Sequence, residues 1–291
     1  MTISGPVAAE RTAGSAWGTS YRVRFDEAGP DGALRTSGFM RFAQDLAWQH
    51  SADLGFGRDW YAERGLTWLV RAAELTILVA PPMGTTVTAR TSIVGMRRVS
   101  ARRRGDFHLA DGTPAAWVHT DWVLIDDRGS LTRIPSIFPE TFGGMGDMGA
   151  VGRVALPPTP PDAEPRRFAV RPHELDPMGH ANNAVYLDWL EEAVVAVSGR
   201  GQAVNAPSTQ PPTTAIPRHY RMEFAMAVGP GDELEDAAWV AAEGWTYRLI
   251  GAGDRVDRFR AVVGPGSPAG DGSGRANAGA VRGHRATETA P

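Results

Sequence analysis

The chain of 291 residues repeats part of itself, and this repeat limits the folds that it can adopt. Residues 21–45 align without a gap with residues 168–192, at an offset of 147 positions. The identical pairs are Val23 with Val170, Arg24 with Arg171, Glu27 with Glu174, Pro30 with Pro177, and Gly32 with Gly179. Each copy reads as a short alternating strand, a turn and a helix. The same order twice, each time followed by further strands, predicts two similar units that arose by duplication.

The segments that follow each copy predict an antiparallel sheet. In the first half, stretches rich in valine, isoleucine, leucine and threonine occupy residues 66–79, 85–96, 99–109 and 115–125. In the second half, comparable stretches occupy residues 168–171, 220–228, 233–242, 245–250 and 256–263. A strand, a long helix from about Ser37 and then consecutive strands are typical of a sheet wrapped round a central helix. The expected fold class is therefore α+β.

Segments of biased composition predict where the two units begin and end. Residues 143–165 are rich in glycine and proline and read as a linker. Residues 264–291 contain almost no large apolar residue and are predicted to be a disordered tail. Residues 1–18 are predicted to be a flexible N-terminus. The predicted units are therefore residues 19–142 and residues 166–263.

The composition excludes several classes of protein. The chain has no cysteine, which excludes disulfides, a thiol nucleophile and cysteine-ligated zinc. Its formal net charge of −3 argues against a nucleic-acid partner. No run of about 18 apolar residues is present to span a membrane, and the first residues lack the apolar core of a signal peptide, so a cytoplasmic location is expected. Seven scattered histidines without an H-x-x-x-H spacing predict no metal site, and no cofactor is expected.

The second copy of the repeat carries a turn with several polar groups, Asp-Pro-Met-Gly-His-Ala-Asn-Asn at residues 176–183. Proline and glycine favour a tight turn, and the two asparagines are good N-caps for a helix that begins near Ala184. The apolar face of this helix is formed by Tyr186, Trp189, Leu190, Ala193, Val194 and Val197. The turn therefore places the Asp176 carboxylate, the His180 imidazole and two amides beside a helix N-terminus, where developing negative charge is favoured.

The first copy lacks these polar groups. At the offset of 147, Asp176 faces Gly29, His180 faces Ala33, and Asn182 and Asn183 face Arg35 and Thr36. A turn with only a structural role gives no reason for this difference between the copies. We therefore expect one functional site, in the second half.

The turn resembles the D-P-x-G-H-x-N-N-x-x-Y pattern of hotdog-fold thioesterases, and two such units in one chain resemble the acyl-ACP thioesterase family. The resemblance extends over residues 65–71, 96–118, 175–191 and 220–224. It implies two tandem hotdog folds that form an intramolecular pseudo-dimer, in a chain that is a monomer or a homodimer. It also implies hydrolysis of a fatty-acyl or polyketide-type acyl thioester, carried by acyl carrier protein or CoA, to the free acid and thiol.

The resemblance also implies roles for residues of the turn. Asp176 is expected to act as general base or nucleophile, with His180 and Asn182 as further catalytic residues. The residues expected to bind substrate are Gly179, Asn183 and Tyr186, and the helix N-terminus is expected to hold the oxyanion. A solvent-facing or capping role stays open for His180, and helix capping stays open for the asparagines.

A run of arginines between two predicted strands of the first half is a candidate contact for the acyl carrier. Arg97 and Arg98 are expected to meet the phosphopantetheine phosphate or the acidic face of a carrier protein, in one basic cluster with Arg102, Arg103 and Arg104. The alternative is a solvated hairpin edge that discourages edge pairing. The first half is expected to form the wall of an acyl tunnel rather than a second active site.

The sequence departs from the plant acyl-ACP thioesterases at two places. Met178 replaces the asparagine of their D-x-N-x-H turn, and Ala227 and Val228 stand where those enzymes carry a Glu-Cys pair. A non-catalytic acyl-thioester-binding protein therefore stays an alternative. A hotdog dehydratase is another alternative, although D-x-x-x-H followed by two asparagines fits a thioesterase better.

Overall fold

The structure is a computed structural model, and it describes residues 16–143, 148, 152–199 and 215–266. The elements of the first half, in chain order, are β1 (Trp17–Arg22), a 3-10 turn (Phe25–Glu27), α1 (Thr36–Asp53), α2 (Arg58–Ala62), β2 (Leu66–Ile77), β3 (Thr86–Met96), β4 (Ser100–Leu109), β5 (Pro114–Asp126) and α3 (Ile137–Phe142). Those of the second half are β6 (Arg166–Ala169), a 3-10 turn (Pro172–Glu174), α4 (Val185–Gly199), β7 (Arg218–Phe224), β8 (Glu233–Ala241), β9 (Gly244–Gly251) and β10 (Asp257–Pro265).

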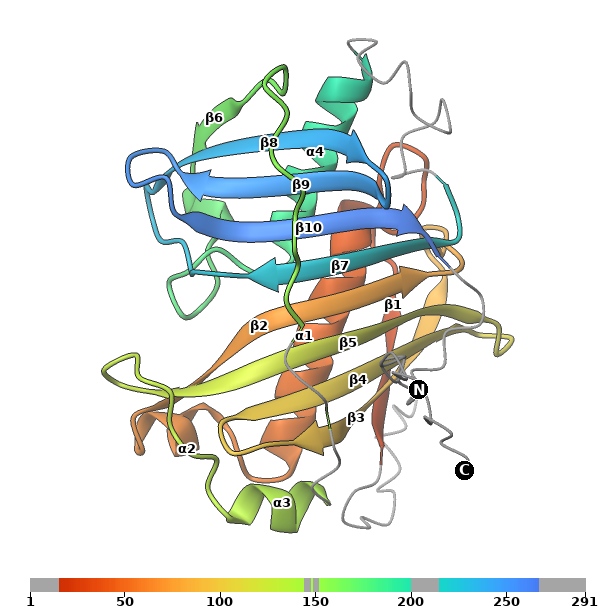
Figure 1. Ribbon diagram of the computed structural model, residues 1–291. Helices are drawn as coiled ribbons and strands as arrows, with labels where there is room; N and C mark the ends of the chain where they lie inside the picture. The colour runs from red at the N-terminus through yellow and green to blue at the C-terminus, as the bar shows by residue number, and fades with distance from the viewer. Residues whose placement is uncertain (1–15, 144–147, 149–151, 200–214, 267–291) are drawn as a thin grey trace, which may run out of the picture.

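The strands form one ten-stranded sheet in the order β1-β3-β4-β5-β2-β7-β10-β9-β8-β6. Its two halves have matching orders and join where β2 pairs antiparallel with β7, for example Leu75 opposite Tyr220. The long helices α1 and α4 contact each other and lie on the same face of the sheet (Figure 1). The α+β class and the tandem pair of helix-wrapped sheets are therefore confirmed.

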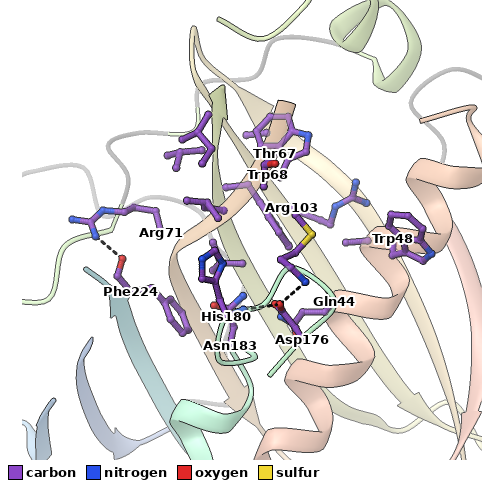
Figure 2. Close-up of a pocket in the computed structure, with 18 of the residues that line it drawn as sticks. Gln44, Trp48, Thr67, Trp68, Arg71, Arg103, Asp176, His180, Asn183 and Phe224 are labelled. Carbon is purple, nitrogen blue, oxygen red and sulfur yellow. Dashed lines mark hydrogen bonds between the residues drawn. The ribbon is translucent and has the colours of Figure 1, made fainter. Parts of the chain in front are cut away.

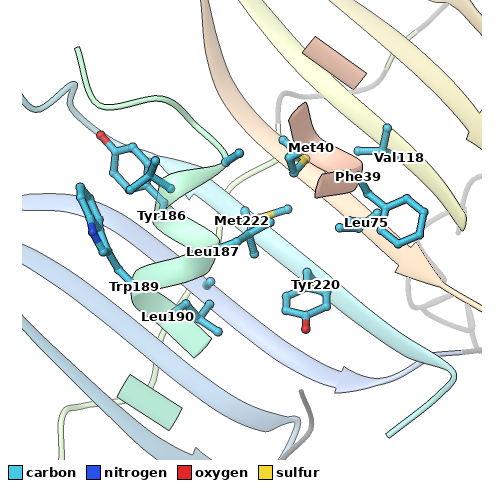
Figure 3. Packing of buried hydrophobic residues seen from close by; sticks show 14 of the residues in the cluster. Phe39, Met40, Leu75, Val118, Tyr186, Leu187, Trp189, Leu190, Tyr220 and Met222 are labelled. Atoms are coloured by element: carbon cyan, nitrogen blue, oxygen red, sulfur yellow. The ribbon is translucent and has the colours of Figure 1, made fainter. Parts of the chain in front are cut away.

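The core lies between this face of the sheet and the two helices. Phe39 and Met40 of α1 and Leu187 and Leu190 of α4 are fully buried and point toward the inward side chains of β2 and β7 (Figure 3). Burying a side chain of this size stabilises the fold by about 1.5–3 kcal/mol. The side chains that the 3.6-residue period places on one face of each helix therefore pack against those that the alternation along β7 places on the inner face of the sheet.

The backbone repeats at the offset found in the sequence. Gly32 and Gly179 both have positive φ, 75° and 77°, which glycine adopts without strain. The Gly29 N–H donates to the Ala33 carbonyl at 2.8 Å, and the Asp176 N–H donates to the His180 carbonyl at 2.8 Å. The two turns therefore have the same backbone fold and differ in their side chains.

The repeat extends into the strands that meet at the centre of the sheet. The Leu34 N–H donates to the Pro81 carbonyl, and the Ala181 N–H donates to the Val228 carbonyl, each at 2.8 Å. The two donors are 147 positions apart in the sequence, and so are the two acceptors. Strand β7 is thus the counterpart of the second part of β2, and Tyr220 is the counterpart of Ala73.

Several predicted boundaries were wrong by a few residues. Strand β1 begins at Trp17, inside the predicted flexible terminus, and β10 continues to Pro265, inside the predicted tail. The strand predicted over residues 220–228 ends at Phe224. Helix α3 was not predicted. The remaining parts of the predicted termini, residues 1–15 and 267–291, lie outside the described residues.

The predicted linker contains no helix or strand over residues 152–165, and this part crosses the face of the sheet opposite the helices (Figure 1). The Gly152 N–H donates to Asp121 Oδ2 at 3.0 Å, and the Val154 N–H donates to Glu223 Oε2 at 3.0 Å. Val154 is buried. The segment therefore packs on both halves of the sheet rather than spanning solvent between them.

Candidate active site

A cavity of about 1260 Å³ runs from the second-half turn into the first half of the molecule (Figure 2). The second half contributes Asp176, Pro177, Met178, residues 180–183, Tyr186 and residues 224–227. The remaining walls come from α1, α2, α3 and β2 to β5 of the first half. Because Met178 and His180 are both exposed and line the cavity, the cavity reaches the surface at this turn.

The turn holds one oxygen of Asp176 and leaves the other available. Asp176 Oδ1 accepts hydrogen bonds from the backbone N–H groups of Met178, at 2.8 Å, and His180, at 3.3 Å. Within the described residues, no group donates to Oδ2. A carboxylate that is oriented by backbone groups and has one unbonded oxygen at a cavity mouth is suited to act as base or nucleophile.

The two asparagines have different environments. Asn182 Oδ1 accepts the N–H of Ala184 at 2.9 Å, so this side chain caps the helix. Asn183 lines the cavity (Figure 2), and neither its amide nor its backbone N–H is hydrogen-bonded to another described residue. The catalytic role predicted for Asn182 stays a prediction, and Asn183 has the freer polar groups of the two.

His180 and Tyr186 both line the cavity but differ in burial. His180 is exposed, and its ring makes no hydrogen bond with the described residues. Tyr186 is 2% exposed and packs against the rings of Trp189, Phe224 and Phe259. Burial raises the pKa of its phenol. Tyr186 is thus a core residue that also forms part of the cavity wall.

Gln44 and Arg71 are among the first-half residues that line the cavity and were not predicted as site residues. Gln44 extends from α1 (Figure 2), and its Oε1 is buried without a hydrogen-bond partner among the described residues. Arg71 of β2 donates to Glu223 Oε1 at 3.1 Å and to the Phe224 carbonyl, which fixes the end of β7 beside the turn. The alignment offers a signal for Gln44, because this polar residue faces Glu191 at the offset of 147.

The corresponding place in the first-half turn is filled. The Tyr220 hydroxyl donates to Glu191 Oε1 at 2.9 Å and lies 3.4 Å from Thr36 Oγ1. Burial raises the pKa of both Tyr220 and Glu191. At the offset of 147, the counterpart of Tyr220 is Ala73, which has no group that could make these hydrogen bonds.

The predicted basic cluster is not one surface. Arg97 and Arg98 are exposed at the turn between β3 and β4 and do not line the cavity. Arg102 forms an ion pair with Asp121, and Arg104 with Asp106. Arg103 is buried inside the molecule. The reason is the alternation of strand β4, which sends successive side chains to opposite faces of the sheet.

The two positions that depart from the plant pattern supply no acid. Ala227 lines the cavity, and the buried Val228 accepts a backbone hydrogen bond from Ala181. The cavity lining at these two positions therefore carries no carboxylate.

The chain has two tandem units, and the turn of the second carries Asp176, His180 and Asn183 at the mouth of the cavity. This combination defines a double hotdog thioesterase. Residues 14–142 match the family model described as the acyl-ACP thioesterase N-terminal domain, and residues 160–198 match its C-terminal domain. The chain belongs to the acyl-ACP thioesterase family and is a thioester hydrolase. A comparison with curated protein sequences finds no match.

Solved structures share the fold over nearly their whole length. A putative oleoyl thioesterase from Lactobacillus plantarum has a TM-score of 0.72 and 18% identity, over 86% of this chain and 95% of that one. The 12:0-ACP thioesterase from Umbellularia californica has a TM-score of 0.67 and 18% identity, over 86% and 96%. An acyl-ACP thioesterase from Bacteroides thetaiotaomicron has a TM-score of 0.67 and 14% identity, over 84% and 96%.

Two further features concern membrane spans and metal binding. In the described part of the chain, no helix has both the length and the apolar character needed to cross a membrane. Over the same residues, no group of three or more histidine, aspartate or glutamate side chains is placed to hold a metal ion.

Proposed function

We propose that the protein hydrolyses a fatty-acyl or polyketide-type acyl thioester, on acyl carrier protein or CoA, with Asp176 activating the attacking water. The observation that supports this most is the unbonded Oδ2 of Asp176 at the mouth of a cavity of about 1260 Å³. The site draws its residues from both halves of one chain, so a second copy is not needed to complete it.

The proposed reaction balances without a cofactor. Asp176 takes a proton from water, and the resulting hydroxide attacks the thioester carbon. The negative oxygen accepts the backbone N–H of Asn183 at the N-terminal end of α4, where the helix dipole stabilises it. The intermediate collapses with cleavage of the C–S bond, and the protonated Asp176 returns its proton to the thiolate. The Gln44 amide, which also lines the cavity, is proposed to orient this water.

The substrate is proposed to lie with its acyl chain in the first half and its carrier at the turn. The first-half lining includes the aromatic side chains of Trp68, Phe138 and Phe142. Trp68 is seen on the cavity wall in Figure 2. The exposed His180 and Met178 mark the side from which the pantetheine arm enters. Arg97 and Arg98, which are exposed, stay candidates for contact with the carrier.

The test is the substitution Asp176→Asn, assayed by release of free thiol from a panel of acyl-carrier and acyl-CoA thioesters. Asparagine keeps the oxygen that the two backbone N–H groups contact and removes the base, so we expect a loss of about 10²–10⁴-fold in kcat. The matched control is Asp31→Asn in the first-half turn, where Asp31 Oδ1 accepts the N–H of Ala33 at 3.1 Å. This control should keep the parent turnover.

Hydrolysis in ¹⁸O-labelled water separates the two roles that Asp176 could have. With Asp176 as base, a single turnover puts the label only into the product acid. With Asp176 as nucleophile, water that attacks the Asp176 carbonyl carbon of the mixed anhydride leaves the label in the side chain, so labelled Asp176 after one turnover identifies the nucleophile. Full activity of Asp176→Asn would remove this carboxylate from the chemistry, and tight acyl binding without hydrolysis by the parent would favour a binding protein.

A further inference from the structure

Arg103 is a charged residue on the wall of the acyl cavity. It lies on the inward side of β4, in the alternating series with Ala101, Gly105 and Phe107, and it is 6% exposed. Its side chain reaches the cavity from the strand (Figure 2). The charge is therefore placed inside the first half and away from bulk water.

The partners of the Arg103 guanidinium are neutral. Nη1 lies 2.9 Å from His50 Nδ1 and donates to Thr91 Oγ1 at 3.3 Å, and the group stands 5.9 Å from the centre of the Phe142 ring. Burial and the adjacent guanidinium lower the pKa of His50 to about 4, so His50 accepts as the neutral imidazole. Within the described residues, no carboxylate pairs with Arg103 and no acceptor is bonded to Nε or Nη2.

The neighbours on the same strand have their charge compensated. Arg102 donates from Nε and Nη2 to the two oxygens of Asp121, at 2.6 and 2.7 Å, and Arg104 pairs with Asp106. A buried charge without a counter-charge is unfavourable unless other groups satisfy its donors. The protein thus keeps two donor groups of Arg103 unpaired beside the space where a ligand lies.

Other polar groups gather at the same part of the wall. The Tyr61 hydroxyl accepts the indole N–H of Trp68 at 3.1 Å, and both residues line the cavity together with Ser51. Tyr61 lies close enough to Arg103 for the guanidinium to act on its pKa, although burial raises the pKa overall. Apolar side chains that line the cavity with them include Val70, Ile93, Met96, Phe138 and Phe142. A polar subsite therefore interrupts an apolar tunnel.

We propose that the cavity selects an acyl group that carries a second oxygen, as hydroxyl, oxo or carboxylate, along its chain, and that Arg103 binds this oxygen. The inference rests on the proposed function, because it requires the acyl chain to lie in this cavity. The planar fork of an arginine suits a carboxylate with two contacts and a single oxygen with one. An unsubstituted chain would leave the donors of Arg103 without acceptors, and a site built to pair with an oxygen discriminates strongly against an analogue that lacks it.

The test compares acyl-pantetheine thioesters of six to fourteen carbons, each with a terminal methyl, hydroxyl or carboxylate group. The length series carries the terminal oxygen to successive depths of the cavity. At one length or more, we expect kcat/KM for an oxygenated thioester to exceed that of its methyl-terminated partner by about 10- to 100-fold. The hydroxyl and carboxylate arms show which oxygen chemistry is preferred. In Arg103→Met the preference should disappear or reverse.

The matched control is Arg104→Met, which removes a charge on the opposite face of the same strand. It should keep the parent preference. Butyryl-pantetheine serves as a substrate too short to need the subsite, so its hydrolysis by Arg103→Met shows that the variant folds and that its active site is intact. The inference is overturned if the parent prefers methyl-terminated chains at every length, or if its preference for oxygenated chains is unchanged in Arg103→Met. Hydrolysis of the thioesters in either case still supports the proposed function.

Binding gives a second readout that does not depend on turnover. The free acids of the same series can be titrated calorimetrically into the parent, Arg103→Met and Arg104→Met. Tighter binding of the oxygenated acids, lost only in Arg103→Met, supports the subsite even where no thioester is hydrolysed. Equal binding of oxygenated and methyl-terminated acids to the parent overturns it.

Discussion

Gln44 offers a test in which stability and activity should move in opposite directions. Its Oε1 is buried and has no hydrogen-bond partner among the described residues, although it lies on a cavity wall. An unsatisfied buried acceptor costs about 1–3 kcal/mol of stability. Gln44→Leu replaces the amide with an apolar side chain of similar size and good helix propensity. We therefore expect the free energy of unfolding to rise by about 1–2 kcal/mol.

The same substitution should slow the reaction. If the Gln44 amide orients the attacking water, its removal takes away one hydrogen bond in the transition state, which corresponds to about 10- to 100-fold in kcat. The assay is thiol release at saturating substrate, together with urea denaturation at constant m-value. For a chain of this size the gain in stability corresponds to a rise in melting temperature of about 2–6 °C.

The control is Gln49→Leu, one helical turn further along α1. Gln49 donates to Asp45 and to the Tyr21 hydroxyl and does not line the cavity, so this variant should lose some stability and keep its turnover. A Gln44→Leu variant with parent turnover would show that the amide takes no part in the reaction. A decrease of more than about 1 kcal/mol in the free energy of unfolding of that variant would show that the amide has a structural partner.

Two further outcomes concern stability alone. The pKa of His50 is lowered from 6.5 to about 4, so between these pH values the unfolded chain binds more protons than the folded protein, and the free energy of unfolding should fall by up to about 3 kcal/mol as the pH drops from 6.5 to 4. Denaturation measured from pH 4 to 8 should show a weaker dependence of this free energy on pH in His50→Gln than in the parent. The same pH dependence in both would contradict the lowered pKa of His50. Glu223 is 2% exposed, pairs with Arg71 and Arg260 and accepts the Val154 N–H, so Glu223→Leu should lower the free energy of unfolding by about 3 kcal/mol. The exposed pair of Glu243 with Arg221 is the control, and Glu243→Leu should cost less than about 1 kcal/mol in the same denaturation experiment.

The elements that the sequence predicts well are those whose signal is local. The turn at residues 176–183, the start of the helix near Ala184 and the strands that follow are encoded by proline, glycine, capping residues and alternation within a few positions. The repeat adds a longer-range signal, because two copies of one pattern at a fixed offset predict two copies of one fold. Helix α3 was missed because its short sequence, Ile137–Phe142, contains a proline and has too few turns for a period to show.

The composition of the site could be predicted only in its second half. Asp176, His180 and Asn183 lie within one turn, so their proximity follows from the chain itself. Gln44, Arg71 and Arg103 reach the same cavity from α1, β2 and β4. Nothing in the local sequence around Arg103 separates it from Arg102 and Arg104, and all of them were predicted as one basic surface.

The sequence by itself determined that two related units exist and that one of them carries a carboxylate beside a helix N-terminus. Only the tertiary structure decided that β2 pairs with β7 and that α1 of the first half contacts α4 of the second. It also decided that the Tyr220 hydroxyl bonds to Glu191 and lies beside Thr36 of the first-half turn. The physical reason is that contacts between strands and helices far apart in the chain depend on register and packing. Register and packing minimise the free energy of the whole fold, and no short stretch of sequence specifies them.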